Sequence, residues 1–104
     1  MKRLAFKMKL HAGKKNEYKK RHDEIWPELV TLLKKYSISD YSIFLDEETN
    51  ILFATYLVNN EDQLKYLSNE PLMKKWWLYM QAIMETNDDA SPISVPLKNV
   101  FFLE

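Results

Sequence analysis

Residues 41–58, with the sequence YSIFLDEETNILFATYLV, decide the fold of this chain. Side chains alternate between two faces from Tyr41 to Leu45, as they do in a strand with one buried face. A short polar turn follows at Glu47–Asn50, and a second strand is predicted over Ile51–Val58. That strand is apolar on both faces, which is typical of a strand inside a covered sheet. The stretch therefore predicts a hairpin whose second strand lies in the middle of a larger sheet.

A strand and a broken helix are predicted before this hairpin. Apolar side chains recur at every second position over Arg3–Leu10, and at every third or fourth position over Lys14–Tyr36. Pro27 lacks an N–H donor and clashes with the preceding turn, so we expect a break near Ile25–Trp26 and a new helical segment from Pro27. The apolar stripe of this helical region consists of Tyr18, His22, Ile25, Leu29, Leu32 and Tyr36.

Two further helices and a last strand are predicted after the hairpin. An asparagine cap is expected to start the first helix, and a proline in the first turn is expected to start the second. The predicted segments are a short helix from Asn59 or Asn60 to Leu67, a helix from Pro71 to about Met84, a polar loop over Thr86–Pro96 and a strand over Leu97–Leu103.

The resulting order, βαββαβ, predicts a single α+β domain of the ferredoxin-like type over residues 1–104. In this arrangement the sheet is antiparallel and its helices cover only one face. The other face needs a cover, and in a chain this short a second copy is the expected one. We therefore expect a homodimer, in a dimeric α/β-barrel type of assembly.

Composition excludes several classes of function. The 104 residues include 15 Lys+Arg, 15 Asp+Glu, no cysteine and one glycine. The formal net charge is zero, which gives no indication of nucleic-acid binding. Without cysteine there is no thiolate nucleophile or zinc–thiolate site, and without further glycines there is no phosphate-binding loop. The apolar runs are too short for a membrane-spanning helix, so a cytoplasmic protein is expected.

His22 is the first candidate for chemistry. It lies in the apolar stripe one turn after Tyr18, so both side chains point toward the core. One interpretation is a core-edge histidine whose ring is satisfied by a backbone carbonyl. The other is a general acid or base, because imidazole titrates near neutral pH. The two histidines, His11 and His22, show no spacing typical of a metal site, and no metal or other cofactor is expected.

Trp76-Trp77 is the second candidate. Adjacent helical residues point about 100° apart, so one tryptophan is expected to pack while the other lines a cleft or an interface. The pair fits an aromatic core with a dimer contact, and it also fits a carbohydrate site, because aromatic faces stack on the C–H faces of sugars. Tyr18, Trp26 and Tyr41 would add to such a site. The basic clusters Lys14-Lys15 and Lys19-Lys20-Arg21 are interpreted as the solvated face of the helix.

Three segments of the chain together resemble the L-rhamnose mutarotase family. They are RHDEIWPEL at residues 21–29, the tryptophan pair 76–77 with Met80, and Ser91-Pro92 before the final aromatic segment. The resemblance extends over essentially the whole chain. Its first segment is specific, because a Trp-Pro break one turn after a histidine in the apolar stripe is an unusual combination, whereas a double tryptophan alone is a weak signal.

The resemblance implies a homodimeric, cofactor-free epimerase that interconverts the α and β anomers of L-rhamnose. It implies that His22 is the proton donor and that Tyr18, Tyr41 and the Trp76-Trp77 pair contact the sugar. Such an exchange requires one proton to reach the ring oxygen and another to leave the anomeric hydroxyl. The base stays open between a water molecule, a tyrosine and a carboxylate.

Two other hypotheses fit the residues. One is a cofactor-free enzyme of the same dimeric architecture that acts on another substrate, such as a monooxygenase or a mutarotase for a different sugar. The other is a ligand-binding or assembly module in which His22 and the tryptophans only pack. The fold alone does not choose between them.

Overall fold

The secondary-structure elements follow the predicted order in the computed structural model, which describes residues 1–104. The strands are β1 (Lys2–Lys9), β2 (Ser39–Asp46), β3 (Ile51–Val58) and β4 (Val95–Pro96). The helices are α1 (Lys15–Asp23), α2 (Pro27–Lys35), α3 (Leu64–Leu67) and α4 (Pro71–Met80), with the 3₁₀ segments η1 (Glu61–Gln63) and η2 (Gln81–Ile83). None of these helices combines the length and the apolar character that a membrane crossing needs.

The four strands form one antiparallel sheet in the order β2-β3-β1-β4. This confirms the α+β, ferredoxin-like arrangement, in which β3 returns between β1 and β2. The β2–β3 hairpin turns through Asn50, which has a φ of 61° and donates its N–H to the carbonyl of Asp46 at 2.8 Å. Asparagine tolerates this left-handed conformation better than most residues, so the sequence itself supports the turn.

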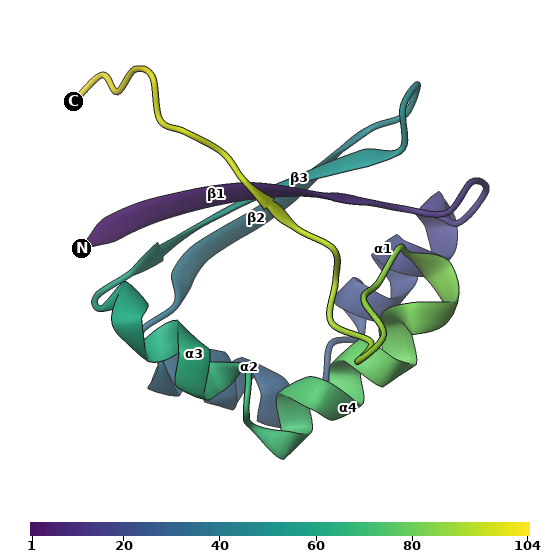
Figure 1. Ribbon diagram of the computed structural model, residues 1–104, viewed down its shortest axis with the longest axis horizontal. Coiled ribbons are helices and arrows are strands. Elements are labelled where there is room, and N and C mark those ends of the chain that lie inside the picture. The colour runs from purple at the N-terminus through teal and green to yellow at the C-terminus, as the bar shows by residue number, and fades with distance from the viewer.

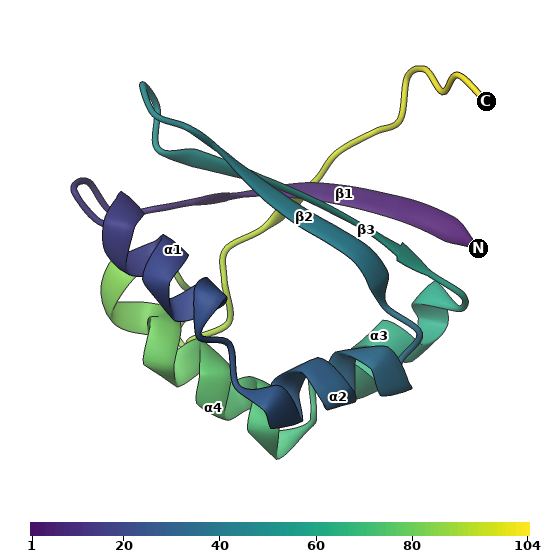
Figure 2. The ribbon, with the colours of Figure 1, turned by 180° about the vertical axis from the view of Figure 1, so that it is seen from behind.

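The helices all lie on one side of the sheet, as Figures 1 and 2 show from opposite directions. The side chains of β1 and β3 that point toward them are buried, including Met8, Leu52, Ala54 and Val58. Phe53, between two of these residues, points to the other side and is 38% exposed. We call the helix-covered side the inner face and the other side the outer face. The expectation of one covered and one uncovered face is therefore confirmed within the chain.

The predicted break between α1 and α2 is confirmed. α1 ends at Asp23, Trp26 adopts an extended conformation with a ψ of 128°, and Pro27 occupies the first turn of α2. The proline causes this by disfavouring helical geometry at the residue before it and by fixing its own φ near the helical value. The break sets α1 and α2 at an angle, so that together they curve around one side of the molecule (Figure 2).

The predicted strand over Leu97–Leu103 is wrong. β4 consists of Val95–Pro96, which pairs with Phe6 and Lys7 of β1, and beyond it the N–H of Leu97 donates to the carbonyl of Ala5 at 2.9 Å. The following residues leave the sheet on its outer side (Figure 1). They read as a strand because they are apolar and aromatic, but a strand also needs a ladder of backbone hydrogen bonds, and after Leu97 the segment makes none to β1.

A candidate active site between the sheet and the helices

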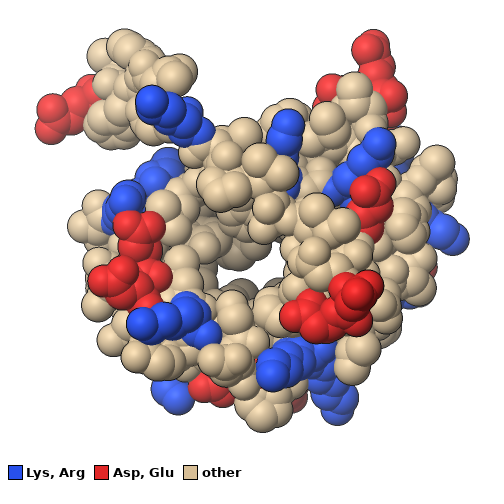
Figure 3. Space-filling view, viewed as in Figure 1, with Lys and Arg blue, Asp and Glu red and all other residues tan.

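A cavity of about 770 Å³ lies between the inner face of the sheet and helices α1, α2 and α4. The space-filling view in Figure 3 shows the opening in the middle of the molecule, with the charged side chains around its outside. Thirteen of the 21 residues that line the cavity are hydrophobic. A cavity of this size with mainly apolar walls and a few polar groups is typical of a small-molecule site.

His22 lies on the wall that α1 contributes to this cavity. Its Nδ1 atom is 3.0 Å from the carbonyl oxygen of Tyr18. A carbonyl oxygen can only accept a hydrogen bond, so Nδ1 donates and carries the ring proton. In the neutral imidazole, Nε2 is then a free acceptor, and no protein group bonds to it. The interpretation of His22 as a core-edge histidine accounts for the hydrogen bond at Nδ1, but it leaves Nε2 available for chemistry.

The surroundings of His22 favour its neutral form. Burial of the ring lowers its pKa below the ordinary value of 6.5, while the hydrogen bond to the Tyr18 carbonyl and the nearby Asp23 carboxylate oppose this effect. Near neutral pH the side chain is therefore uncharged. An uncharged imidazole with a free Nε2 accepts a proton before it can donate one.

Two aromatic rings fix the orientation of the imidazole. The Tyr18 ring stacks on it with a centroid separation of 4.3 Å and an interplanar angle of 29°. The Trp76 ring meets it edge-on, at 5.5 Å and 90°. Both geometries are preferred for aromatic pairs, and together with the Nδ1 hydrogen bond they restrict rotation of the ring. Helices α1 and α4 thus hold the histidine jointly.

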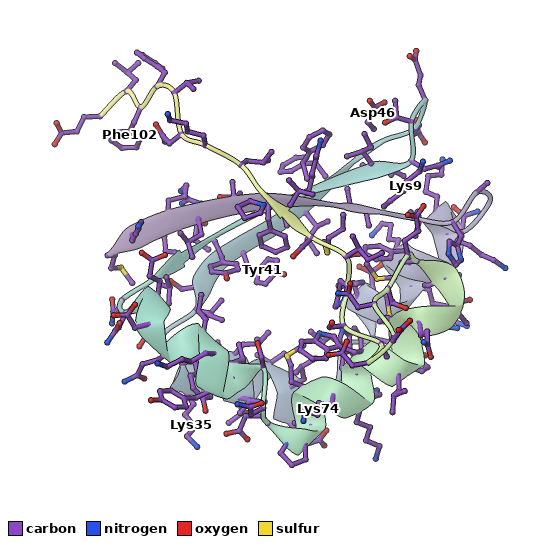
Figure 4. The ribbon with its side chains drawn as sticks, in the orientation of Figure 1. Lys9, Lys35, Tyr41, Asp46, Lys74 and Phe102 are labelled. Atoms are coloured by element: carbon purple, nitrogen blue, oxygen red, sulfur yellow. The ribbon has the colours of Figure 1, made fainter.

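Tyr41 enters the cavity from the opposite wall, the sheet. It lies with Asp40, which has a φ of 50°, in an irregularity of the β2–β3 pairing between Ser39 and Ser42. Figure 4 shows the Tyr41 side chain in the space below the sheet, so its 40% exposure is exposure to the cavity. Its ring centroid is 5.1 Å from that of Tyr56.

Both phenols of the cavity stay protonated over the physiological pH range. Burial raises the pKa of Tyr18 well above its ordinary value of 10.0. Burial also raises the pKa of Tyr41, and the neighbouring hydroxyls of Tyr18 and Tyr56 add to this rise. A neutral phenol donates and accepts hydrogen bonds but is a weak base, so the tyrosinate alternative for the base finds no support here.

The two adjacent tryptophans have different surroundings, as their 100° separation predicts. Trp76 is 6% exposed, lines the cavity and contacts His22. Trp77 is half-buried, packs against the edge of the core and does not line the cavity. The structure therefore brings together Tyr18, His22, Tyr41 and Trp76 from three different elements, and leaves Trp77 apart.

The interpretation of Arg21 as part of a solvated face is wrong. Lys19 and Lys20 are exposed, but the Arg21 side chain retains only 16% of its exposure and points toward α4. A partial signal was present in the sequence, because Glu17 lies four residues before Arg21 and bonds to it within the helix. The contact with α4 joins residues 58 positions apart, so local spacing does not reveal it.

His11 lies outside the site. It is exposed, and its Nδ1 is 3.4 Å from the carbonyl oxygen of Ala82. The chain brings no three His, Asp or Glu side chains close enough together to hold a metal ion. The Tyr18, His22 and Tyr41 side chains that line the cavity can each donate or accept hydrogen bonds.

The chain is similar to known proteins over its whole length. The model of the L-rhamnose mutarotase family matches residues 3–103. L-rhamnose mutarotases from Formosa agariphila and Rhizobium meliloti are 54% and 52% identical to the chain, each over the full length of both sequences. The crystal structure of the Formosa agariphila L-rhamnose mutarotase superimposes with a TM-score of 0.93 at 53% identity, over the whole of both chains. The chain belongs to the L-rhamnose mutarotase family.

Proposed function

We propose that this isomerase interconverts the α and β anomers of L-rhamnose in the cavity between the sheet and the helices. Membership of the family supports the activity and the substrate. The observation that carries the location is the free Nε2 of His22, which borders an apolar cavity with two neutral phenols. A 6-deoxy sugar suits such a cavity, because its methyl group prefers apolar walls while its hydroxyls need hydrogen-bond partners.

His22 is the proposed catalytic residue. In its neutral form it accepts the proton of the anomeric hydroxyl at Nε2, and the imidazolium then donates this proton to the ring oxygen. The bond between the anomeric carbon and the ring oxygen breaks, which gives the open-chain aldehyde. Rotation about the adjacent carbon–carbon bond and the reverse steps close the other anomer. Both oxygens are bonded to the same carbon, so one imidazole can serve as base and then as acid.

Tyr18, Tyr41 and Trp76 are the proposed substrate-binding residues. The two phenols can donate hydrogen bonds to sugar hydroxyls from opposite walls, because their raised pKa values keep them protonated. Trp76 supplies an aromatic surface beside His22. For Trp77, the proposed sugar contact rests on the resemblance alone.

Saturation-transfer proton NMR of equilibrated L-rhamnose tests this proposal. Saturating one anomeric signal depletes the other when the protein accelerates their exchange. We expect transfer with the wild type and with His11→Ala, and none above the spontaneous rate with His22→Ala. Transfer that persists in a folded His22→Ala variant would remove His22 from the chemistry. Absence of transfer with the wild type would favour the binding-module hypothesis.

We also propose that residues 1–104 act as one domain in a cytoplasmic homodimer. The outer face has no helix over it and exposes Phe44 (67%) beside its cross-strand partner Phe53. The C-terminal segment continues this apolar surface, with exposed fractions of 73–90% at Val100, Phe101, Phe102 and Leu103. Apolar surface of this kind on a small chain indicates a protein interface, and a second copy presents the same surface.

Analytical ultracentrifugation of the wild type and of a Phe101→Glu/Phe102→Glu variant tests the dimer. We expect the wild type to sediment as a dimer at micromolar concentration and the variant to dissociate while staying folded. A stable 12.5 kDa wild-type monomer would contradict the proposed assembly.

A further inference from the structure

Arg21 links α1 to α4 at the end of the molecule that holds His22. Its Nε donates to Glu17 Oε2 at 2.7 Å, and its Nη1 donates to the carbonyl oxygen of Tyr79. The guanidinium carbon also lies 4.3 Å from the centroid of the Tyr79 ring. The Tyr79 bond is the one hydrogen bond between α1 and α4, so the two helices that hold the imidazole are joined through this side chain.

Tyr79 continues this contact toward the cavity through two tryptophans. Its ring centroid is 5.6 Å from Trp76 and 5.5 Å from Trp26. Trp26 in turn meets Trp76 edge-to-face at 4.9 Å. Trp76 is the ring whose edge contacts His22. A continuous set of contacts therefore leads from the Arg21 guanidinium to Tyr79, from Tyr79 to Trp76, and from Trp76 to the His22 imidazole.

We propose that Arg21 is a positioning residue for the reaction, which holds Tyr79 and thereby keeps Trp76 against His22. Arg21 does not line the cavity, so it acts through these rings and not on the sugar. This inference rests on the proposed role of His22 in the proposed function.

The chemistry of the contact requires arginine in particular. The guanidinium lies over the Tyr79 ring while two of its nitrogens donate hydrogen bonds, to Glu17 and to the Tyr79 carbonyl. A lysine would keep the charge, but its ammonium cannot stack as a plane and fork toward Glu17 and Tyr79 together. Because the contact orients His22 without binding the sugar, its loss should reduce kcat with little effect on KM.

Three variants test this role. Arg21→Met keeps the length of the side chain, Arg21→Lys keeps its charge, and Lys20→Met is the control at the adjacent exposed position. We expect Arg21→Met to lower kcat by about tenfold with a nearly unchanged KM, which is less than the ~10²-fold that a 1 Å misplacement of a catalytic group can cost. Arg21→Lys should lie between Arg21→Met and the wild type, and Lys20→Met should match the wild type.

The proton signals of the His22 ring, recorded without sugar, give a readout that does not depend on activity. Ring currents from Tyr18 and Trp76 set these signals, so Arg21→Met should move them and Lys20→Met should not. If Arg21→Met does not fold, Tyr79→Leu removes the same aromatic contact at a 43% exposed position and should produce the same displacement. Unmoved His22 signals and an unchanged kcat in a folded Arg21→Met or Tyr79→Leu variant would overturn the inference.

A different experimental result would contradict the proposed function. Full activity of His22→Ala would contradict the catalytic role of His22, whatever Arg21→Met does to the ring signals. An inactive His22→Ala beside a fully active Arg21→Met would instead leave the proposed function standing and remove only the positioning role of Arg21.

Discussion

The inner and outer faces of the sheet are built by the same three long strands, yet they differ in what covers them. On the inner face, Leu52 is 1% exposed, and the cavity with His22 lies between it and the helices. On the outer face, Phe44 is 67% exposed and the C-terminal segment leaves the sheet without a partner. Alternation along a strand places neighbouring residues in these two environments. The comparison shows that the cavity and the exposed apolar surface lie on opposite faces of the sheet.

Replacing His22 should have the largest effect on the chemistry of the inner face. We expect His22→Ala to reduce the rate of anomer exchange by ~10²–10⁴-fold, the range that positioned acid–base groups contribute. His11→Ala is the matched control, because His11 is exposed and lies outside the cavity. Comparable losses in both variants would mean that the cavity is not the catalytic site.

Replacing one residue on each face of the sheet should sharpen the contrast in their contributions to stability. We expect Leu52→Ala to lower the free energy of unfolding by ~2–5 kcal/mol, since it leaves a hole in the core. Phe44→Ala should change it by less than ~0.5 kcal/mol in the dissociated chain, as is usual for exposed positions. Urea denaturation at several protein concentrations measures both effects. A Phe44→Ala effect that grows with protein concentration would indicate that a second copy covers the outer face.

The adjacent tryptophans allow the same comparison on one helix. We expect Trp76→Phe to weaken sugar binding or turnover by about threefold to tenfold, which corresponds to the ~0.5–1.5 kcal/mol of an aromatic contact. Trp77→Phe should have a smaller effect, because Trp77 does not line the cavity of its own chain. Steady-state kinetics and tryptophan fluorescence with added L-rhamnose measure the difference. An equal or larger effect of Trp77→Phe would show that the sugar contact implied by the resemblance is real.

Acid should have the smallest and most gradual effect, and it acts through His22. The pKa of this residue is lowered in the folded chain, so the unfolded chain binds more protons just below pH 6.5. Stability should therefore be constant above about pH 6.5 and fall as the pH drops toward the folded pKa. kcat/KM should stay constant through pH 6.5 and fall only below it, because the proposed mechanism starts from the neutral ring.

His22→Gln is the control for this pH dependence. In this variant, the free energy of unfolding should lack the decrease below pH 6.5 that His22 causes in the wild type. Thermal unfolding at several pH values measures this difference. A kcat/KM that rises on acidification through pH 6.5 would contradict the proposal that neutral His22 starts the reaction as a base.

Much of the fold could be predicted because its causes are local. The strand character of Ile51–Val58, the polar turn at Glu47–Asn50 and the break before Pro27 follow from the conformational preferences of a few neighbouring residues. The pairing of Tyr18 with His22 follows in the same way from their separation by four residues on a helix. This local pair predicts part of the candidate site, and the family resemblance carried by residues 21–29 and 76–77 implies the rest of it.

Other features depend on contacts between residues that are far apart in the sequence. The segment after Leu97 has the composition of a strand but makes no backbone hydrogen bond to β1. The sequence predicts that Arg21 is a surface residue beside Lys19 and Lys20. Its burial depends on Tyr79, which lies 58 positions later in the chain. Sequence spacing alone also did not decide which tryptophan faces the cavity.

The sequence by itself therefore determined the order of the elements, the helix break and the face on which His22 and Tyr18 lie, because each depends on backbone sterics over a few residues. Only the tertiary structure decided that Tyr41 faces His22 across a cavity, that Trp76 and not Trp77 lines it, and that Nε2 is the free nitrogen of the imidazole. These features depend on how the sheet and the helices pack against each other, which no local pattern specifies.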